Sequence, residues 1–495
     1  MPHLEIPNIR LGNKLLMVLN CFFLFFGSQP VLEAKEERKP NIVFILADDL
    51  GWADVGYNGA EFYETPNIDA LRSSGMAFSN AYPGAANCMP SRAMIMSGMY
   101  TTRTKMWQPG VVSKGEVPLM RLLVPNQENR KGDGKILAKG SLEPSVVSLA
   151  EMLKEGSYKT CHLGKWHLGR EDGQGFDEND VDGRGAGLNK DHKFYGDEDV
   201  AEWLTDAAVD YLGDHKEESF FLYLSHFDPH VPLNAREKVV EKYRKKLASR
   251  KWDRKWNPVY AAMVEAVDTS VGRVRKALQD HGLEENTLLI FTSDNGGFVG
   301  ATTNAPLKGY KGSFYEGGLR APLCMSWPKI IQPGTVCDTP VIGVDYFPTF
   351  AELAGVSLPD QATQPTDGVS MVPLMKGQSI EERAIYWYYP LYLTGPGGTT
   401  PVFGTQKMHW RATPCSVVRK GDWKLMQFFE TGEVELYNLK DDVGESQNLA
   451  ASHSQQAAEL LHDLKQWQKR TNVDIPSTLN PEFDPSLKPI PKRKK

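Results

Sequence analysis

NIVFILADD (residues 41–49) is a continuous apolar run that ends abruptly in two carboxylates. A run that is apolar on both faces is typical of a strand buried in a parallel sheet, and charge at its carboxyl end lies where α/β folds place their sites. FFLYLSH (220–226) and TLLIFTSD (287–294) are similar runs, and the second of them again ends in a carboxylate. The three segments predict strands of one mostly parallel sheet.

Helical stretches lie between these runs. SVVSLAEMLKEG (145–156) has Ser145 as a candidate N-cap and Gly156 as a candidate C-cap. Residues 199–213 predict a second helix, and apolar residues recur at helical spacing over residues 263–278. Alternating helices and strands predict an α/β fold whose sheet is sandwiched by helices.

The pattern changes after about residue 375. Three strand-like runs, AIYWYYPLYL, SVVRKGDWKLMQFF and EVELYNL, follow one another without helices between them, and a helical stretch at 457–470 comes after them. We therefore expect a main α/β domain over residues 35–375 and a smaller C-terminal α+β subdomain, an antiparallel sheet plus a helix, over residues 376–475. Residues 476–495 are rich in proline and end in KRKK, which predicts a disordered basic tail.

The N-terminus has the sequence pattern of a targeting signal. Residues 15–26 (LLMVLNCFFLFF) are apolar, follow Arg10 and Lys14, and precede small or turn-forming residues. This run is too short to span a bilayer and is typical of a secretory signal peptide, which we assign to residues 1–34 with cleavage after Ala34. The expectation is an exported protein, secreted or periplasmic, without a stable membrane span after cleavage; the alternative is an uncleaved anchor.

Composition excludes several classes of protein. With 495 residues, 41% of them hydrophobic and 24% charged, the chain is long enough to bury a sizeable core. Its 56 Lys and Arg against 62 Asp and Glu give a formal charge of -6, so no overall basic field favours nucleic acid as a partner. Six cysteines without a CxxC pair make a disulfide framework or a structural zinc site improbable. An anionic substrate would have to be held by local charges.

One cysteine stands out because of its surroundings. In CMPSRAMIMSG (88–98), Pro90 fits the first turn of a helix that continues to Gly98. Cys88 is therefore expected at a helix N-terminus, where free amides and the helix dipole favour an anion, and Arg92 adds a fixed charge. The alternative is a cysteine that serves only as a small buried hydrophobe.

CMPSR resembles the CxPSR signature of the type I sulfatases, the formylglycine-dependent arylsulfatase-like family of the alkaline phosphatase superfamily. GSYKTCHLGKWH (156–167) resembles the second signature of that family. Further similar blocks are ADD at 47–49, SDNGG at 293–297 and KGSFYEGGLRAP at 311–322, together with VRKGDWKL and ELYNLKDD near the C-terminus. The resemblance covers essentially the whole mature chain and implies an alkaline-phosphatase-like fold.

The resemblance implies an exported sulfatase, a sulfuric ester hydrolase that acts on sulfate monoesters. A small molecule or a carbohydrate could carry the sulfate, and export favours sulfated carbohydrate. It also implies that Cys88 is converted to formylglycine (3-oxoalanine) by a formylglycine-generating enzyme or an anaerobic sulfatase-maturating enzyme. The hydrated aldehyde would supply a gem-diol whose hydroxyl attacks sulfur, and its collapse would release sulfate.

A metal site is expected at two strand ends. Asp48 and Asp49 follow one strand, and Asp294 and Asn295 follow another. Hard oxygen donors suit Ca²⁺ or Mg²⁺ rather than zinc, and the resemblance favours Ca²⁺, with the converted side chain of Cys88 as a further ligand. The alternative for each acidic pair alone is a helix cap or a turn.

The resemblance also implies a set of groups that bind the sulfate and move protons. Arg92, Lys165 and Lys311 would hold sulfate oxygens. The neighbouring Lys308 is the alternative to Lys311 in this loop, and we expect it to be an ordinary surface residue. His167, two residues after Lys165, would orient the diol; in an extended segment both would share one face. His230 would protonate the leaving group, with His226 as its rival.

Other residues receive weaker interpretations. Glu316 and Arg320 are expected to pair and to stabilise the loop that carries Lys311. Residues 101–140 and 170–198 are long and polar and could form the rim of the substrate pocket. Trp107, His409 and Trp410 are candidates for sugar or aryl contacts, or equally for packing.

Two functions compete with a sulfatase. A phosphomonoester or phosphonate hydrolase of the same superfamily would use a similar anion clamp and metal, although Ser or Thr would be the more natural nucleophile. A sulfate-binding protein without turnover would result if Cys88 were never converted.

Overall fold

The structure is a computed structural model, in which the described residues from Lys39 onward belong to one unit. The expected signal peptide lies outside the residues that the structure describes. Within the described ranges, no helix combines the length and the apolar character that a bilayer crossing needs. The structure describes residues 38–107, 114–124, 138–169, 174–181, 197–252, 256–394 and 410–487.

An eight-stranded sheet forms the centre of this unit, with strand order β5-β4-β6-β1-β7-β8-β2-β9. The five strands from β5 to β7 are mutually parallel, and β8 runs antiparallel to both β7 and β2. This confirms the predicted mostly parallel sheet. The strands are β1 (Asn41–Ala47), β2 (Met76–Phe78), β4 (Lys159–Gly164), β5 (Glu178–Val181), β6 (Phe220–Ser225), β7 (Thr287–Ser293), β8 (Leu323–Ser326) and β9 (Thr335–Cys337).

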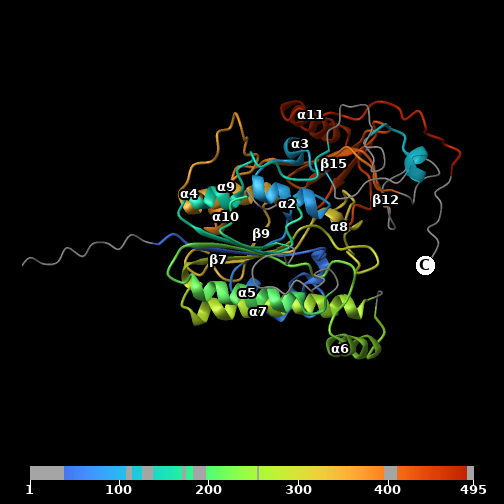
Figure 1. Ribbon diagram of the computed structural model, residues 1–495. Coiled ribbons are helices and arrows are strands. Elements are labelled where there is room, and N and C mark those ends of the chain that lie inside the picture. The colour runs from blue at the N-terminus through green and yellow to red at the C-terminus, as the bar shows by residue number, and fades with distance from the viewer. Residues whose placement is uncertain are drawn as a thin grey trace, which may run out of the picture. The chain divides into compact units, whose positions relative to one another are not determined.

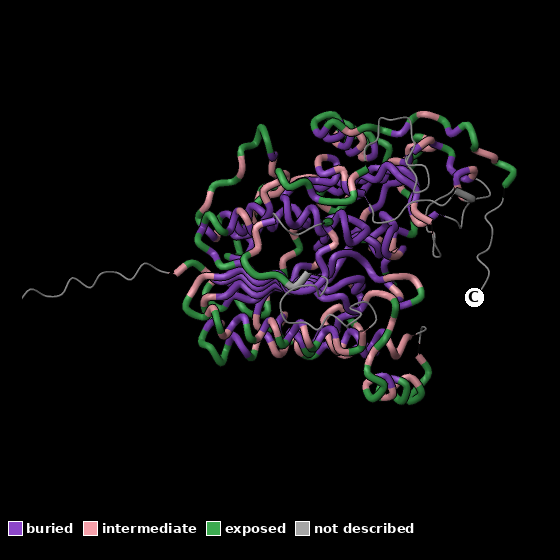
Figure 2. Tube along the Cα trace, viewed as in Figure 1, coloured by how far each residue is buried: buried purple, intermediate pink, exposed green. Residues whose placement is uncertain are grey.

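Helices cover both faces of the sheet (Figure 1). One face carries α5 (Val200–Asp214) and α7 (Pro258–Asp280). The other carries α2 (Cys88–Ser97), α4 (Leu149–Glu155), α9 (Tyr346–Ala354) and α10 (Val372–Met375). Figure 2 shows the strands buried between these two layers.

β1 shows why a continuous apolar run was needed at the centre. Val43 and Ile45 pack into the core on the side of α5 and α7, whereas Ile42, Phe44 and Leu46 pack into the core on the side of α2, α4 and α9. Side chains alternate between the faces of a strand, so the interior positions of a strand that is covered on both sides are predominantly apolar.

The helix expected from residue 145 begins later than predicted. α4 starts at Leu149, and Ser148 rather than Ser145 is its N-cap. The Ser148 hydroxyl accepts a hydrogen bond from the Glu151 amide (3.2 Å), and the Glu151 carboxylate accepts one from the Ser148 amide (2.7 Å). This reciprocal pair requires a glutamate three residues after the cap, and only Ser148 has one.

The C-terminal part has the predicted antiparallel sheet and helix. The sheet has strand order β11-β14-β15-β16, and Leu460, Leu464 and Trp467 of the helix α11 are buried in the core beside it. Trp467 stacks on Tyr386 of β11 at 4.8 Å between ring centroids. The elements are β11 (Ala384–Tyr389), β14 (Cys415–Lys420), β15 (Trp423–Phe428), β16 (Val434–Asn438) and α11 (Ser454–Arg470). The domain boundaries at residues 375 and 475 stay predictions.

Residues 476–487 differ from the expected disordered tail. Asn480 is 5% exposed, and its side-chain amide donates to the carbonyl oxygens of Val117 (2.9 Å) and Met120 (2.8 Å). Leu479 forms a β-bridge with Leu122. The proline-rich composition does not prevent these contacts. The side chain of Asn480 alone binds two backbone carbonyls. Residues 488–495 lie outside the described part of the chain.

Candidate active site

The sheet brings the predicted site residues together at one edge. In the register of the central strands, Leu46 of β1 lies opposite Ser225 of β6 and Thr292 of β7. The parallel strands therefore end side by side, and the residues that follow them meet at the carboxyl edge of the sheet. The N-terminus of α2 points its first residue, Cys88, into the same cluster.

Four oxygen-bearing side chains form the base of the cluster. Asp48, Asp49, Asp294 and Asn295 are fully buried. The Asp49 amide donates to Asp294 Oδ1 (3.3 Å), and the Asn295 side-chain amide donates to Asp49 Oδ1 (2.7 Å). Asp49 has a left-handed backbone with φ of 65°, which few residues other than glycine adopt without supporting contacts.

Each carboxylate is paired with a different cationic side chain. Lys165 pairs with Asp48, Lys311 Nζ lies 2.6 Å from Asp49 Oδ1, and Arg92 Nη2 lies 2.8 Å from Asp294 Oδ2. The numbers of buried acids and bases in this cluster are therefore equal.

These ion pairs shift the pKa values of Asp48, Asp49 and Arg92. Burial alone would raise the pKa of Asp48, but Lys165 and His230 hold it below its usual value; Lys311 does the same for the pKa of Asp49. Burial would lower the pKa of Arg92, but Asp294 raises it. The shifts therefore favour the charged forms of Asp48, Asp49 and Arg92.

Cys88 lies among these charges at the start of α2. Its side chain is 1% exposed, and Lys311 Nζ lies 3.7 Å from its Sγ. Sγ and one carboxylate oxygen each of Asp48 and Asp294 all lie within 4.8 Å of one another. One turn into the helix, Arg92 donates to the carbonyl oxygen of Lys165 (2.6 Å) as well as to Asp294.

The predicted helix boundaries around Cys88 are confirmed. α2 begins at Cys88 after the N-cap Asn87, and its C-cap is Gly98, whose φ is 68°. A Cβ atom at position 98 would lie 2.7 Å from Phe347 Cβ. Both the conformation and the space therefore require glycine at the end of this helix.

The oxygen atoms in the cluster fit a divalent cation. Asp48 Oδ1, Asp49 Oδ2 and Asn295 Oδ1 are buried and accept no hydrogen bond. Buried polar atoms are normally satisfied, and an unmet set of oxygens from one amide and two carboxylates is what Ca²⁺ or Mg²⁺ coordinates. Together with Asp294, these residues could hold such an ion.

His230 lies in the cluster and its rival does not. His230 Nε2 is 3.6 Å from Asp49 Oδ2, and the side chain is 20% exposed. His226 is fully buried, and its Nε2 lies 3.0 Å from the Ser270 hydroxyl on α7. Burial lowers the pKa of His226 to about 4, so this imidazole is neutral and part of the core.

His167 is near the cluster but in an unexpected conformation. β4 ends at Gly164, and His167 has φ of 63° instead of lying in an extended segment with Lys165. Burial, followed by the charges of Lys165 and Arg92, lowers the pKa of His167 to about 4. A neutral imidazole beside these cations can accept a proton or a hydrogen bond.

Comparison with known proteins identifies the family of the chain. The model of the sulfatase family matches residues 40–356, and the model of the C-terminal part of N-sulphoglucosamine sulphohydrolase matches residues 310–473. The chain belongs to the sulfatase family. It is a sulfuric ester hydrolase.

Individual relatives of this sulfatase match along most of their length. A sulfatase of Formosa agariphila is 32% identical over 91% of this chain and 92% of its own, and human arylsulfatase A is 28% identical over 90% of each. Among solved structures, Ps i-CgsB in complex with k-i-k-neocarrahexaose superposes with a TM-score of 0.68 at 27% identity, over 90% of this chain and 95% of its own. These matches support the fold of the sulfatase as a whole.

The loop after β7 contains the predicted pair of Glu316 and Arg320, and it distinguishes Lys311 from the alternative Lys308. Arg320 Nε donates to Glu316 Oε2 (2.7 Å), so the predicted pair exists. Lys308 turns away from the cluster, because its Nζ donates to the Glu445 carbonyl (3.1 Å) and lies 4.0 Å from the centroid of the Tyr315 ring. Lys311 is the lysine of this loop that lies beside Cys88.

Sequence reasoning missed Ser225. Its hydroxyl accepts a hydrogen bond from Arg92, and its backbone carbonyl accepts one from the Lys165 amide (2.9 Å). Ser225 is the last residue of β6, so its place at the same strand edge as Asp48 was the signal that could have identified it.

The aromatic candidates for the rim are packed in the core. Trp107 is 3% exposed and lies 5.1 Å from the Tyr388 ring, and Trp410 is 1% exposed and lies 4.8 Å from the Tyr392 ring. His409 and, in the two predicted rim segments, residues 108–113, 125–137, 170–173 and 182–196 lie outside the described residues.

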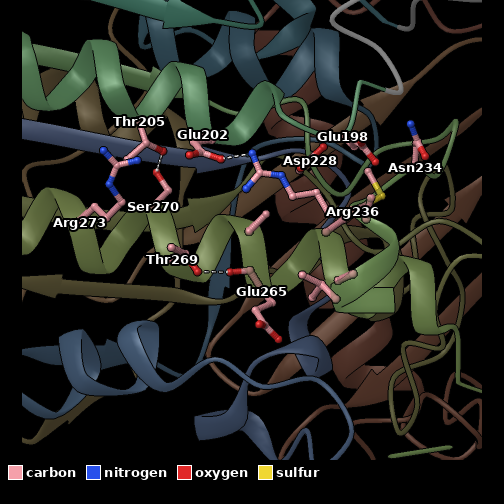
Figure 3. A pocket seen from close by; sticks show the side chains of 15 residues that line it. Glu198, Glu202, Thr205, Asp228, Asn234, Arg236, Glu265, Thr269, Ser270 and Arg273 are labelled. Carbon is pink, nitrogen blue, oxygen red and sulfur yellow. Dashed lines mark hydrogen bonds and ion pairs between the residues drawn. The ribbon is translucent and has the colours of Figure 1, made fainter. Parts of the chain in front are cut away.

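A cavity of about 380 Å³ lies between α5, α7 and the segment after β6 (Figure 3). Glu202 and Arg236, which form an ion pair, and the buried Asp228 line it. Glu198, from the predicted rim segment 170–198, is among its described lining residues, whereas the predicted catalytic and metal-binding residues are not. Burial, with the nearby Asp48 and Asp197, raises the pKa of Asp228 to about 8. The Asp228 carbonyl accepts the Asp48 amide (3.0 Å), so this wall supports the first aspartate of the cluster.

Proposed function

We propose that this sulfatase hydrolyses sulfate monoesters of carbohydrates and that the cluster around Cys88 is its active site. The observation that carries the proposal is the meeting of Cys88 with three buried carboxylates and three buried cations. The carbohydrate substrate is supported by the oligosaccharide in the Ps i-CgsB complex and by the export signal expected at residues 1–34.

Charge balance supports an anionic substrate. In the cluster, the carboxylates of Asp48, Asp49 and Asp294 are balanced by an equal number of cationic side chains. A divalent cation bound by the carboxylates would leave a surplus of positive charge in a buried place. Such a surplus favours an anion, and it stabilises charge that develops on sulfate oxygens more strongly than water would.

We assign the metal to Asp48, Asp49, Asp294 and Asn295, with the converted side chain of position 88 as a further ligand. Ca²⁺ is the proposed ion, with Mg²⁺ as the alternative. Bound there, the ion would act as a Lewis acid on a sulfate oxygen and on the nucleophile.

We infer that Cys88 is converted to formylglycine by a formylglycine-generating or an anaerobic sulfatase-maturating enzyme. The hydrated aldehyde supplies a hydroxyl nucleophile and, on collapse, a route for sulfate to leave. The position of residue 88 supports this role: it begins α2, where backbone amides and the helix dipole favour negative charge.

The remaining site residues hold the substrate and move protons. Sulfate oxygens would be bound by Lys165, Lys311 and Arg92. The cationic groups of these side chains pair with the carboxylates that surround Cys88, so they lie close to the proposed nucleophile. His167, held neutral, would accept a proton from the hydroxyl at position 88. His230, part of whose side chain is exposed, would donate a proton to the leaving alcohol.

The test compares sulfate and phosphate release from matched aryl esters by natively matured protein. Cys88→Ala is expected to abolish sulfate release, and Lys311→Ala to lower kcat by about 100- to 1,000-fold, the loss typical of one electrostatic donor. Cys415→Ala removes a buried cysteine of the C-terminal sheet and should leave kcat unchanged. Turnover retained in Cys88→Ala, or faster release of phosphate than of sulfate, would contradict the proposal.

A panel of defined sulfated mono- and disaccharides tests the substrate. We expect at least one of them to be desulfated with a higher kcat/KM than the aryl ester. Desulfation of aryl esters alone would contradict the carbohydrate part of the proposal and leave the mechanism standing.

A further inference from the structure

The loop that carries Lys311 is fixed to the active site by its backbone. The Lys311 amide donates to the Gly297 carbonyl (3.0 Å), two residues after Asn295. The Gly312 amide donates to the Ala86 carbonyl (2.7 Å), two residues before Cys88. Any displacement of this loop therefore changes the position of the Lys311 ammonium group relative to the proposed metal ligands and nucleophile.

The other side of the same loop is held by a buried charge cluster from the C-terminal sheet. Lys424 Nζ, on β15, lies 2.9 Å from Glu316 Oε1 and 2.8 Å from Glu445 Oε1. Glu316 begins the short helix α8 (Glu316–Leu319), and its amide donates to Glu445 Oε2 (2.6 Å). All three side chains are fully buried.

Glu316 is also held from the catalytic side. Its Oε2 accepts hydrogen bonds from Arg320 Nε (2.7 Å) and the Tyr82 hydroxyl (2.8 Å). Arg419 of β14 donates to that same hydroxyl. The carboxylate of Glu316 therefore connects three parts of the chain: the loop that carries Lys311, the segment at Tyr82, and the C-terminal sheet.

Stability alone does not account for so many buried charges. Apolar side chains of similar volume often stabilise a core as well as a buried ion pair does, whereas an ion pair fixes the relative position of its partners. The cluster contacts the loop five residues after Lys311, and the backbone bonds of Lys311 fix the loop on its active-site side. The two attachments together determine where the ammonium group lies.

We propose that Lys424, together with Glu445, is a positioning residue for Lys311, through which the C-terminal sheet sets the geometry of the sulfate-binding group. The inference rests on the proposed role of Lys311. Lys424 does not touch the reacting atoms; it acts through Glu316 and the loop.

The test is a double-mutant cycle on sulfate release from an aryl ester. Lys424→Met is measured alone and combined with Lys311→Ala, below the melting temperature of every variant. Alone, Lys424→Met should lower kcat by about 10- to 100-fold, the size expected when a catalytic group shifts by about 1 Å. In the Lys311→Ala background it should lower kcat by less than about twofold, because the group that it positions is already gone.

Lys420→Met is the matched control. Lys420 lies in the same sheet and pairs with Asp463 of α11 (3.1 Å), away from α8. It should change kcat in neither background. The loss of melting temperature in Lys424→Met is recorded separately and should be the same with and without Lys311.

The outcomes separate the two hypotheses. If Lys311→Ala lowers kcat and Lys424→Met lowers it by an equal further factor in that background, Lys424 acts independently and the inference is overturned while the proposed function stands. If Lys311→Ala keeps the full kcat, the proposed role of Lys311 fails, and the inference fails with it. An unchanged kcat in Lys424→Met alone also overturns the inference.

Discussion

Removal of the divalent cation is the perturbation on which the buried carboxylates make the sharpest prediction. Three oxygens of Asp48, Asp49 and Asn295 are buried without a hydrogen-bond partner, so an ion should bind the folded chain and not the unfolded one. The ion-free protein should still fold, because Arg92, Lys165 and Lys311 balance the charge of the three aspartates.

The size of the effect follows from linkage. Calcium at about 1,000 times its dissociation constant adds about 4 kcal/mol to the free energy of unfolding. A compact unit of about 450 residues has an unfolding entropy of about 1 kcal/mol/K. The melting temperature should therefore fall by about 4 °C when a chelator removes the ion, and sulfate release should cease.

The assay is thermal unfolding and sulfate release measured in chelator, in Ca²⁺ and in Mg²⁺. Asn295→Ala removes one unpartnered oxygen without a change in charge, so the calcium concentration that gives half of the shift should rise at least about tenfold. Cys415→Ala should show the full shift. If a chelator changes neither the melting temperature nor the activity, the carboxylates do not hold a metal; recovery with Mg²⁺ but not Ca²⁺ would refute the choice of ion.

Three further predictions concern single positions. Arg92→Met leaves the buried Asp294 without its ion pair and should lower the free energy of unfolding by about 3–5 kcal/mol, measured by denaturant unfolding; a change below about 1 kcal/mol would contradict this ion pair. Gly98→Ala places a Cβ 2.7 Å from Phe347 Cβ, at a φ of 68°, and should lower the free energy of unfolding by about 1–3 kcal/mol. Gly432→Ala has a similar φ of 77° but no atom within 4 Å of its Cβ, so it should lower the free energy of unfolding by less. Equal losses in the two variants would disprove the packing argument. Burial raises the pKa of the Glu445 carboxyl from 4.5 to about 7; Lys424 partly offsets this shift and Glu316 adds to it. The folded protein therefore holds this proton more tightly than the unfolded chain does. The resulting contribution to stability is fully present below about pH 4.5 and is lost as the pH rises towards 7. The melting temperature of Glu445→Gln relative to the unchanged protein should therefore rise between pH 5 and about 7.5, and a constant difference would contradict the shift.

Much of the fold could be predicted because the central strands are buried on both faces. A strand such as β1 must be apolar at its interior positions, and the polar residues after it mark the edge of the sheet. The resemblance to the sulfatases then placed Asp48 and Asp294 together, at the ends of the paired strands β1 and β7. The strand order could not be predicted in this way, since β6, β1 and β7 have equally apolar runs.

Side-chain contacts between distant segments were harder to predict. The Arg92–Ser225 hydrogen bond joins residues 133 positions apart, and the Lys424–Glu316 pair joins β15 of the C-terminal sheet to the helix α8 across 108 positions. Neither contact leaves a periodic signal in the sequence. The conformation of His167 was missed because, in a residue other than glycine, left-handed backbone depends on the surrounding contacts, which the local sequence does not show.

Mass spectrometry of the peptide that contains position 88, taken from natively matured protein, tests the central claim most directly. We expect the mass of an aldehyde, in which oxygen has replaced sulfur with the loss of two hydrogens, and we expect the converted fraction to scale with sulfate release. A free thiol at position 88 in fully active protein would contradict the proposed nucleophile.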